Sequence, residues 1–179
     1  TDPSDLVLLL RVSAGDKAPM RALYLRYEAV LYRYIRTRLS APHEAADALQ
    51  DVMLAVWRGA GAGQDRQQVR AWLFTIARNK ASDRLRRTQR DIPTEPDDKV
   101  PDSAPNPEQL TAAAEDASRV RRCLETLSVA HRTVLQLAFF QELSYPEIAE
   151  VESLSVGTVK TRVHHAKRLM AYCLGRPAA

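Results

Sequence analysis

The sequence predicts an all-α protein, built from two small helical domains that are joined by an extended acidic linker. Apolar residues recur every three or four positions over long stretches in both halves of the chain, and no stretch shows the sustained alternation of a strand. Residues 91–107 contain five prolines and almost no apolar side chains, so they cannot bury enough surface to offset the entropy of ordering. We therefore expect a first domain over residues 1–90, a linker over residues 91–115 and a second domain over residues 116–179.

Charge is distributed in three blocks along the chain of 179 residues. Residues 1–90 carry 16 Lys and Arg against 9 Asp and Glu, residues 91–118 carry 1 against 8, and residues 119–179 carry 9 against 5. Two basic blocks on either side of an acidic strip favour nucleic acid as a partner. The alternative is that these cations lie on ordinary solvated helix faces.

Targeting, metal and thiol signals are weak. No apolar run is long enough to cross a membrane and no signal segment opens the chain, which begins at Thr1, so we expect a cytoplasmic protein without membrane insertion. Cys123 and Cys173 form no CxxC pair, so we expect neither a disulfide framework nor a zinc site, and we expect buried structural thiols, with an oxidant-sensing role left open. The adjacent His164 and His165 point to different sides of a helix, which argues against a shared metal, and no cofactor is expected.

Three helices are predicted in the first domain, over residues 22–39, 45–58 and 68–87. In the second of them the core stripe is expected to be Ala45, Leu49, Val52, Met53 and Val56. The opposite face gathers two carboxylates, an amide and a leucine, namely Asp47, Gln50, Asp51 and Leu54. Such a face suits a partner surface that is basic and partly apolar, and the alternative is a polar face with one exposed leucine.

The third helix combines many cations with an exposed aromatic residue. Its core stripe is expected to be Leu73, Ala77, Ala81 and Leu85. A second stripe, set in a field of basic side chains, consists of Trp72, Ile76, Asn79 and Asp83, with Lys80, Arg84 and Arg87 beside it. Aromatic stacking next to cations is how proteins hold unpaired bases. The alternative for Trp72 is simple packing against a neighbouring helix.

The second domain is predicted to contain a helix-turn-helix. Two helices are expected within residues 123–140, the second capped by Ser128, and a capping box of Ser144 and Glu147 opens another helix. The last 27 residues contain no Asp or Glu. Their helix should bury a stripe of Val156, Val159, Val163, Ala166 and Met170.

The opposite face of this last helix is cationic and polar, and we expect it to enter the major groove of DNA. It presents Gly157, Thr158, Thr161, His164, His165 and Arg168, flanked by Lys160, Arg162 and Lys167. Threonine methyls can touch thymine and Arg can bond guanine bidentately, while the flanking lysines suit phosphates. The alternative is a basic amphipathic helix that binds a protein groove.

Four of these segments together resemble the signatures of the extracytoplasmic-function sigma factors, the smallest bacterial promoter-specificity subunits. They are residues 47–57, 70–87, 144–149 and 157–162, and the resemblance covers roughly residues 17–174 in order and spacing. It implies sigma domains 2 and 4 joined by a linker. It also implies that the Asp47 face docks on the β′ clamp helices of core RNA polymerase, which contacts the chain through its β subunit as well.

The resemblance further implies how promoter DNA is bound. The helix from Arg70 to Arg87 would melt the −10 element and capture a flipped base, the helix-turn-helix would read the −35 element, and an anti-sigma factor would hold the chain inactive. Two departures are relevant. Glu152 and Ser153 replace the usual Leu-Gly of the turn, where a left-handed position costs Ser more than Gly, and the glycine-rich loop 59–67 lacks the usual Phe-rich pattern.

No set of residues at catalytic spacing is present, so we expect a sigma factor and not an enzyme. Two alternatives belong to other functional classes. A stand-alone helix-turn-helix regulator would account for residues 144 onward, but not for the Asp47 face or the Trp72 stripe. A sigma-like decoy that only binds an anti-sigma factor would need no basic reading face.

Overall fold

The computed structural model describes residues 3–61, 69–91 and 112–175, and the part of the chain it describes contains helices and no strand. The all-α fold class is therefore confirmed for these residues. The helices group into two compact units, Thr1–Pro93 with Ala149–Ser153, and Thr94–Ile148 with Leu154–Ala179. Most of the predicted linker, at 92–111, and most of the loop at 59–67 lie outside the described residues.

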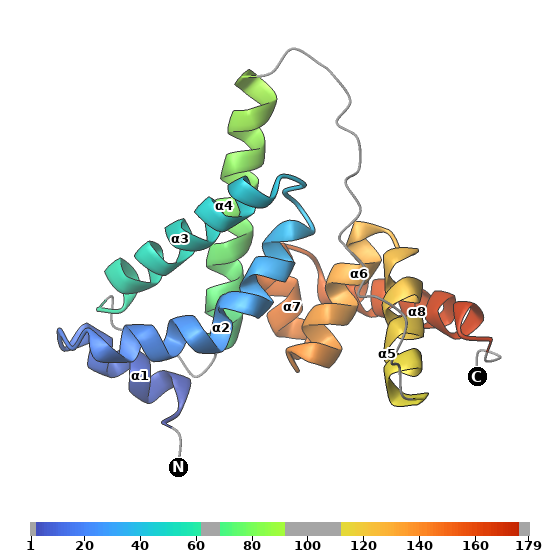
Figure 1. Ribbon diagram of the computed structural model, residues 1–179, viewed down its shortest axis with the longest axis horizontal. Helices are drawn as coiled ribbons and strands as arrows, with labels where there is room; N and C mark the ends of the chain where they lie inside the picture. Colours follow the sequence, from blue (N-terminus) through green and yellow to red (C-terminus); the bar gives the residue numbers. More distant parts are fainter. Residues whose placement is uncertain (1–2, 62–68, 92–111, 176–179) are drawn as a thin grey trace. The chain divides into compact units, whose positions relative to one another are not determined.

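Four helices form the first unit (Figure 1), and they are α1 (Asp5–Ser13), α2 (Ala18–Arg36), α3 (Pro42–Gly59) and α4 (Val69–Asp91). The three predicted helices are confirmed as α2, α3 and α4. The sequence interpretation missed α1, although Ser4 caps it by accepting a hydrogen bond from the backbone N–H of Val7. Nine residues give a short periodic pattern, and α1 is stable because it buries Leu8 and Leu9 against its neighbours.

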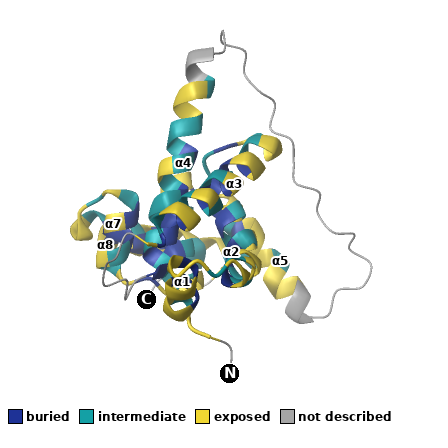
Figure 2. Cartoon of the chain, turned by 90° about the vertical axis from the view of Figure 1, so that its left-hand side faces the viewer, coloured by how far each residue is buried: buried dark blue, intermediate teal, exposed yellow. Residues whose placement is uncertain are grey.

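The core of the first unit is built from one stripe of each helix (Figure 2). On α3 the buried residues are Ala45, Ala48, Leu49, Val52 and Val56. On α4 the predicted Leu/Ala stripe is buried at Leu73, Ala77 and Ala81, while Leu85 is 37% exposed. The expectation was wrong for Leu85, because α4 extends to Asp91 and its last turns leave the core. Met53 is only half-buried, so it lies at the edge of its stripe.

Polar contacts join the first turn of α1 to the middle of α2. The carboxylate of Asp5 pairs with the guanidinium of Arg26 and accepts a hydrogen bond from the Tyr27 hydroxyl. Burial raises the pKa of Tyr27, and the hydrogen bond to Asp5 raises it further. Tyr27 therefore stays protonated and keeps donating to Asp5 well into the alkaline range.

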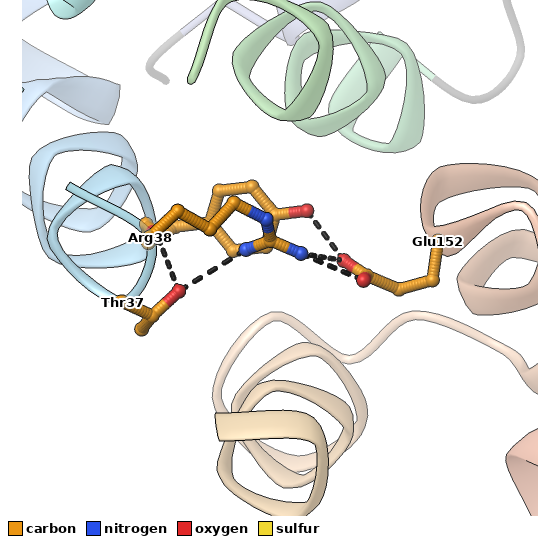
Figure 3. A network of polar contacts seen from close by, with 4 residues as sticks. Thr37, Arg38 and Glu152 are labelled. Carbon is orange, nitrogen blue, oxygen red and sulfur yellow. Dashed lines mark hydrogen bonds and ion pairs between the residues drawn. The ribbon is translucent and has the colours of Figure 1, made fainter. Parts of the chain in front are cut away.

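A second polar network lies at the end of α2 (Figure 3). The guanidinium of Arg38 donates two hydrogen bonds to the carboxylate of Glu152, at 2.7 and 2.8 Å, and lies 4.4 Å from the ring centre of Tyr34. The Tyr34 hydroxyl donates to the same carboxylate, and the Thr37 hydroxyl is bonded to Arg38 and to the backbone. Burial raises the pKa of Tyr34 well above its ordinary value.

The second unit is a set of short helices around the last one, and they are α5 (Ala112–Glu125), α6 (Val129–Leu135), η1 (Gln136–Phe140), α7 (Tyr145–Glu152) and α8 (Val156–Cys173). The last residues of α7 group with the first unit. Both predicted caps are confirmed. Ser128 accepts from the N–H of His131, and Ser144 and Glu147 each accept a hydrogen bond from the other's backbone N–H.

The core of this unit lies along α8, where Val159, Val163 and Ala166 are buried. Met170 is half-buried and Val156 is 36% exposed, so the predicted stripe was wrong for Val156, which lies in the first turn beyond the core. Arg132 of α6 donates to the carbonyls of Leu124, Glu125 and Leu127 and so satisfies the C-terminal end of α5.

Cys123 and Cys173 form a disulfide that joins α5 to the last residue of α8. This corrects the expectation of two structural thiols. The residues are 50 positions apart in sequence, and their Cα atoms lie 5.8 Å apart. Cysteine spacing indicates local motifs but carries no information on which distant helices pack together, so this pair could not be predicted from spacing.

Among the described residues no helix has both the length and the apolar character needed to cross a membrane. Within the same part of the chain, no group of three His, Cys, Asp or Glu side chains lies close enough to bind a metal ion.

The turn between α7 and α8 keeps a left-handed residue although Ser153 stands where the family usually has Gly. Ser153 has φ of 53°, and its N–H bonds to the carbonyl of Glu150 at 3.3 Å. A residue with a Cβ atom is strained in the left-handed region of φ and ψ, whereas glycine is not.

We predict that Ser153→Gly raises the free energy of unfolding by about 1 kcal/mol, because the strain of a Cβ in the left-handed region is removed. Thermal unfolding followed by circular dichroism should show a higher midpoint. Ser155→Gly is the matched control, since Ser155 has an ordinary φ of −74° and caps α8. Equal or lower stability of Ser153→Gly would contradict the assignment of strain to this turn.

Candidate nucleic-acid and protein interfaces

The exposed face of α3 is the first candidate interface. Asp47, Gln50 and Leu54 are exposed, Leu54 to 50%, and Asp51 is half-buried, so the predicted set lies together on one face. Trp57, three residues beyond Leu54, is 47% exposed and extends this face with a large apolar surface. The sequence interpretation missed Trp57, although its spacing from Leu54 and Gln50 indicated the same face.

The carboxylates of this face are bonded to α4. Arg84 donates to Asp51 from Nη2 at 2.8 Å and from Nε at 3.2 Å, and its Nη1 lies 3.4 Å from Asp47. A nearby bond from the Thr88 hydroxyl to Glu44, at 2.7 Å, joins the same two helices. Arg84 was predicted to serve DNA melting. In this structure its guanidinium holds the acidic face of α3 in place.

The remaining residues of the predicted melting set lie along α4. Asn79 and Arg87 are exposed, whereas Trp72, Ile76, Lys80 and Asp83 are half-buried. Asp83 forms an ion pair with Arg86 one turn away.

Trp72 contacts the end of α3. A Cβ added at Gly59 would lie 3.2 Å from the indole ring, so the missing side chain of this glycine makes room for the indole. The packing alternative for Trp72 is therefore supported for the part of the ring that faces Gly59, and the residue as a whole is half-buried.

The second candidate interface is the polar face of α8. The side chain of Ser155 caps the helix by accepting from the N–H of Thr158 at 3.0 Å. The exposed residues of the predicted reading face are Gly157, Lys160, Thr161, His164, His165 and Arg168, and the half-buried ones are Thr158 and Arg162. The structure thus brings the predicted set together on one helix that carries no Asp or Glu.

Hydroxyl groups on this face are partly engaged within the helix. Thr161 donates to the carbonyl of Gly157 at 3.0 Å, and the hydroxyls of Thr158 and Ser155 lie 2.8 Å apart. Because its hydrogen is used internally, Thr161 can offer a base its methyl group or an acceptor oxygen.

Two contacts join α8 to neighbouring elements, and the sequence indicated neither. The ring of His131 on α6 stacks beside His165, with centroids 6.4 Å apart. The ammonium of Lys167 lies 4.9 Å from the ring centre of Phe139 on η1. Lys167 is thus directed toward η1, which makes Lys160 the better candidate for a phosphate contact.

Comparison with known proteins places both interfaces in matched regions. The model of Sigma-70 region 2 matches residues 23–91, which span α2 to α4, and that of Sigma-70 region 4 matches residues 117–170. Over 164 residues the chain is 33% identical to the ECF RNA polymerase sigma factor SigL of Mycobacterium tuberculosis, a match that covers 90% of this chain and 92% of SigL. The chain belongs to the ECF RNA polymerase sigma factors.

Other relatives agree. The sigma factor is 32% identical to RpoE of Cereibacter sphaeroides over 171 residues, which cover 93% of each chain. It is 36% identical to SigM of Mycobacterium tuberculosis over 172 residues, which cover 96% of this chain and 85% of SigM.

Solved structures show the same fold. CnrH, in complex with the cytosolic domain of CnrY, aligns with a TM-score of 0.63 and 25% identity over 96% of this chain and 97% of CnrH. RpoE of Bartonella quintana, in complex with the anti-sigma factor NepR, aligns with a TM-score of 0.64 and 24% identity over 87% of this chain and 96% of RpoE.

The pairing of Arg84 with Asp51 should contribute a coupling free energy of about 0.5–1 kcal/mol, modest because both side chains are partly exposed. A double-mutant cycle of Arg84→Ala and Asp51→Asn, followed by urea unfolding, measures it. The exposed pair of Arg86 and Asp83 is the matched control and should couple more weakly. A coupling of zero for Arg84 and Asp51 would show that the pair does not join α3 to α4.

Proposed function

We propose that this sigma factor directs core RNA polymerase to promoters of specific sequence, through the α3 face, the exposed face of α4 and the polar face of α8. The observation that carries the proposal is the contrast between two surfaces in matched regions. One is acidic and apolar on α3, and the other is cationic and free of acids on α8. The chain does no chemistry itself. It acts in the cytoplasm, where polymerase and promoter DNA lie.

The α3 face fits a basic and partly apolar protein partner. Leu54 and Trp57 offer apolar area in the middle of a carboxylate-bearing face, which matches the composition of a buried interface centre with a charged rim. The β′ clamp helices of core polymerase are the proposed partner, and the β subunit contacts the chain elsewhere. Arg84 holds Asp51 in position before docking, which lowers the entropy lost on binding.

The exposed face of α4 fits an unpaired base. Asn79 is exposed and can bond a base edge, and Arg87 is an exposed cation for the DNA phosphates. Trp72 is half-buried and would stack on the base with the part of its ring that does not face Gly59. These residues lie on α4, which is bonded to the α3 face through Arg84 and Asp51. A captured −10 base would therefore lie at a fixed position relative to the polymerase contact on α3.

The polar face of α8 fits the major groove at the −35 element. Arg168 and Thr161 lie two turns apart on the face opposite the buried Val159 and Val163, while Lys160 lies at the flank. A helix cap at Ser155 leaves the first turn well ordered for close approach to DNA.

An anti-sigma factor is the proposed inhibitory partner. RpoE of Bartonella quintana is found in a complex with the anti-sigma factor NepR, and CnrH is found in a complex with the cytosolic domain of CnrY. Two exposed functional surfaces on separate units can be covered by one partner, and we propose that it covers the α3 face, the α8 face or both. A decoy or a stand-alone regulator would lack one of the two surfaces, which separates them from the proposed function.

Leu54→Glu should abolish binding to core polymerase with unchanged helicity, because Leu54 is 50% exposed and supports no core packing. Pull-down on purified core enzyme measures the affinity. Leu25→Glu on α2 is the matched control, since Leu25 is 61% exposed outside this face. Near-normal binding of Leu54→Glu would contradict docking through α3.

Asn79→Ala should reduce open-complex formation by about tenfold while closed-complex binding stays unchanged, since a contact with an unpaired base, worth about 1–2 kcal/mol, exists only after melting. Permanganate footprinting of thymines near the start site reports the melted state. Undiminished reactivity at equal closed-complex occupancy would rule out base capture by Asn79.

Arg168→Ala and Thr161→Ala should each relax preference at one position of the −35 element by about 1–3 kcal/mol. Lys160→Ala should weaken binding to all sequences alike and reduce the slope of log affinity against log salt by about one unit. Binding to a panel of singly substituted −35 sites at several salt concentrations separates the two classes. Uniform losses for Arg168→Ala and Thr161→Ala would mean that another face reads the bases.

A further inference from the structure

The disulfide of the second unit connects two helices, α5 and α8, that make few other contacts with each other. Cys123 lies in the last third of α5, and Cys173 is the last residue of α8. A hydrogen bond from Arg119 to the carbonyl of Leu174, at 2.7 Å, is a further link between α5 and the end of α8. The main packing of α8 is with α6. The position of α5 therefore depends on the crosslink, whereas the position of α8 depends mainly on its packing with α6.

The two cysteines differ in exposure. Cys123 is 3% exposed, whereas Cys173 is exposed at the end of its helix. Solvent therefore reaches the residue Cys173, whereas the surrounding side chains enclose Cys123. Thiol–disulfide exchange is directed by which sulfur is accessible, so attack at Cys173 is favoured.

We propose that the Cys123–Cys173 bond is a redox-exchange site, at which small cellular thiols and their disulfides open and close the link between α5 and α8. The inference rests on the proposed function in one respect, because a sigma factor works in a cytoplasm where thiols keep permanent disulfides rare. A disulfide in that compartment with one exposed cysteine belongs to the exchangeable class.

The exchange balances with a small thiol RSH as the co-reactant. Its thiolate bonds to the sulfur of Cys173 and the bond to Cys123 breaks, which leaves a thiol on Cys123 after protonation. A second RSH then attacks the mixed disulfide and releases RSSR with a thiol on Cys173. The protein gains two hydrogens and two RSH become one RSSR, and oxidation by RSSR is the reverse.

Opening the bond should release α5 and leave the DNA-reading helix in place. Val159, Val163 and Ala166 keep α8 packed, and Arg132 still caps the C-terminal end of α5. The part of α5 before Cys123 loses its covalent tether. Because a crosslink that closes a loop of this length restricts the unfolded chain strongly, the reduced unit should also be less stable.

The test uses the full chain, equilibrated with reduced or oxidised glutathione. Thiol titration should find two free thiols in the reduced protein and none in the oxidised one. The melting temperature should fall on the order of 10 °C on reduction. Amide hydrogen exchange should speed up in α5 and stay unchanged in α6 and the middle of α8. Cys173→Ser, which changes an exposed residue, should melt like the reduced protein in either buffer.

Two variants test the direction of attack. In Cys123→Ala the thiol of Cys173 should take up glutathione from its disulfide at least about tenfold faster than the buried thiol of Cys123 does in Cys173→Ser. Equal rates would overturn the proposed attack at Cys173. A crosslink that survives excess reduced glutathione, two thiols that stay unpaired in oxidised glutathione, or identical melting of the two states would overturn the exchange site. None of these measurements involves polymerase or promoter DNA, so they are independent of the proposed function.

Discussion

The close packing of α3 against α4 is the constraint on which the surfaces of the first unit depend. Four alanines, Ala45 and Ala48 on α3 and Ala77 and Ala81 on α4, are fully buried in its core. In this packing the guanidinium of Arg84 on α4 reaches the carboxylates of Asp47 and Asp51 on α3. A larger residue at any of these fully buried alanines would overpack the core on which this arrangement rests.

This packing has a functional consequence in the proposed mechanism. The docking face on α3 and the base-capturing face on α4 stand on two helices that share a core and an ion-pair network, so they move as one body. Binding energy gained on the polymerase can then position the melting residues without a further ordering cost. The second unit follows the same design on a smaller scale, since buried Val159, Val163 and Ala166 fix α8 and leave its polar face free.

Periodicity and capping were sufficient to predict most of the fold. The helices α2, α3, α4 and α8 and the caps at Ser128 and Ser144 all follow from local rules that involve residues within one or two helical turns. The placement of the two candidate faces on α3 and α8 followed as well, because a buried stripe determines which residues lie opposite.

The parts that could not be predicted depend on tertiary contacts. Helix α1 is too short to show a clear period. The pairings of Arg84 with Asp51, of Lys167 with Phe139 and of Cys123 with Cys173 join residues on different helices, and sequence spacing does not indicate which helices meet. The spacing of Val156 and Leu85 predicted that both are buried, but they lie in terminal turns of their helices that extend beyond the core.

Run-off transcription with purified core RNA polymerase on a library of promoter sequences tests the central claim most directly. The account predicts that adding this chain yields transcripts from a subset of templates that share a −35 and a −10 element at fixed spacing, and that core enzyme alone yields none of them. Binding to core polymerase without any promoter-specific transcript would contradict it.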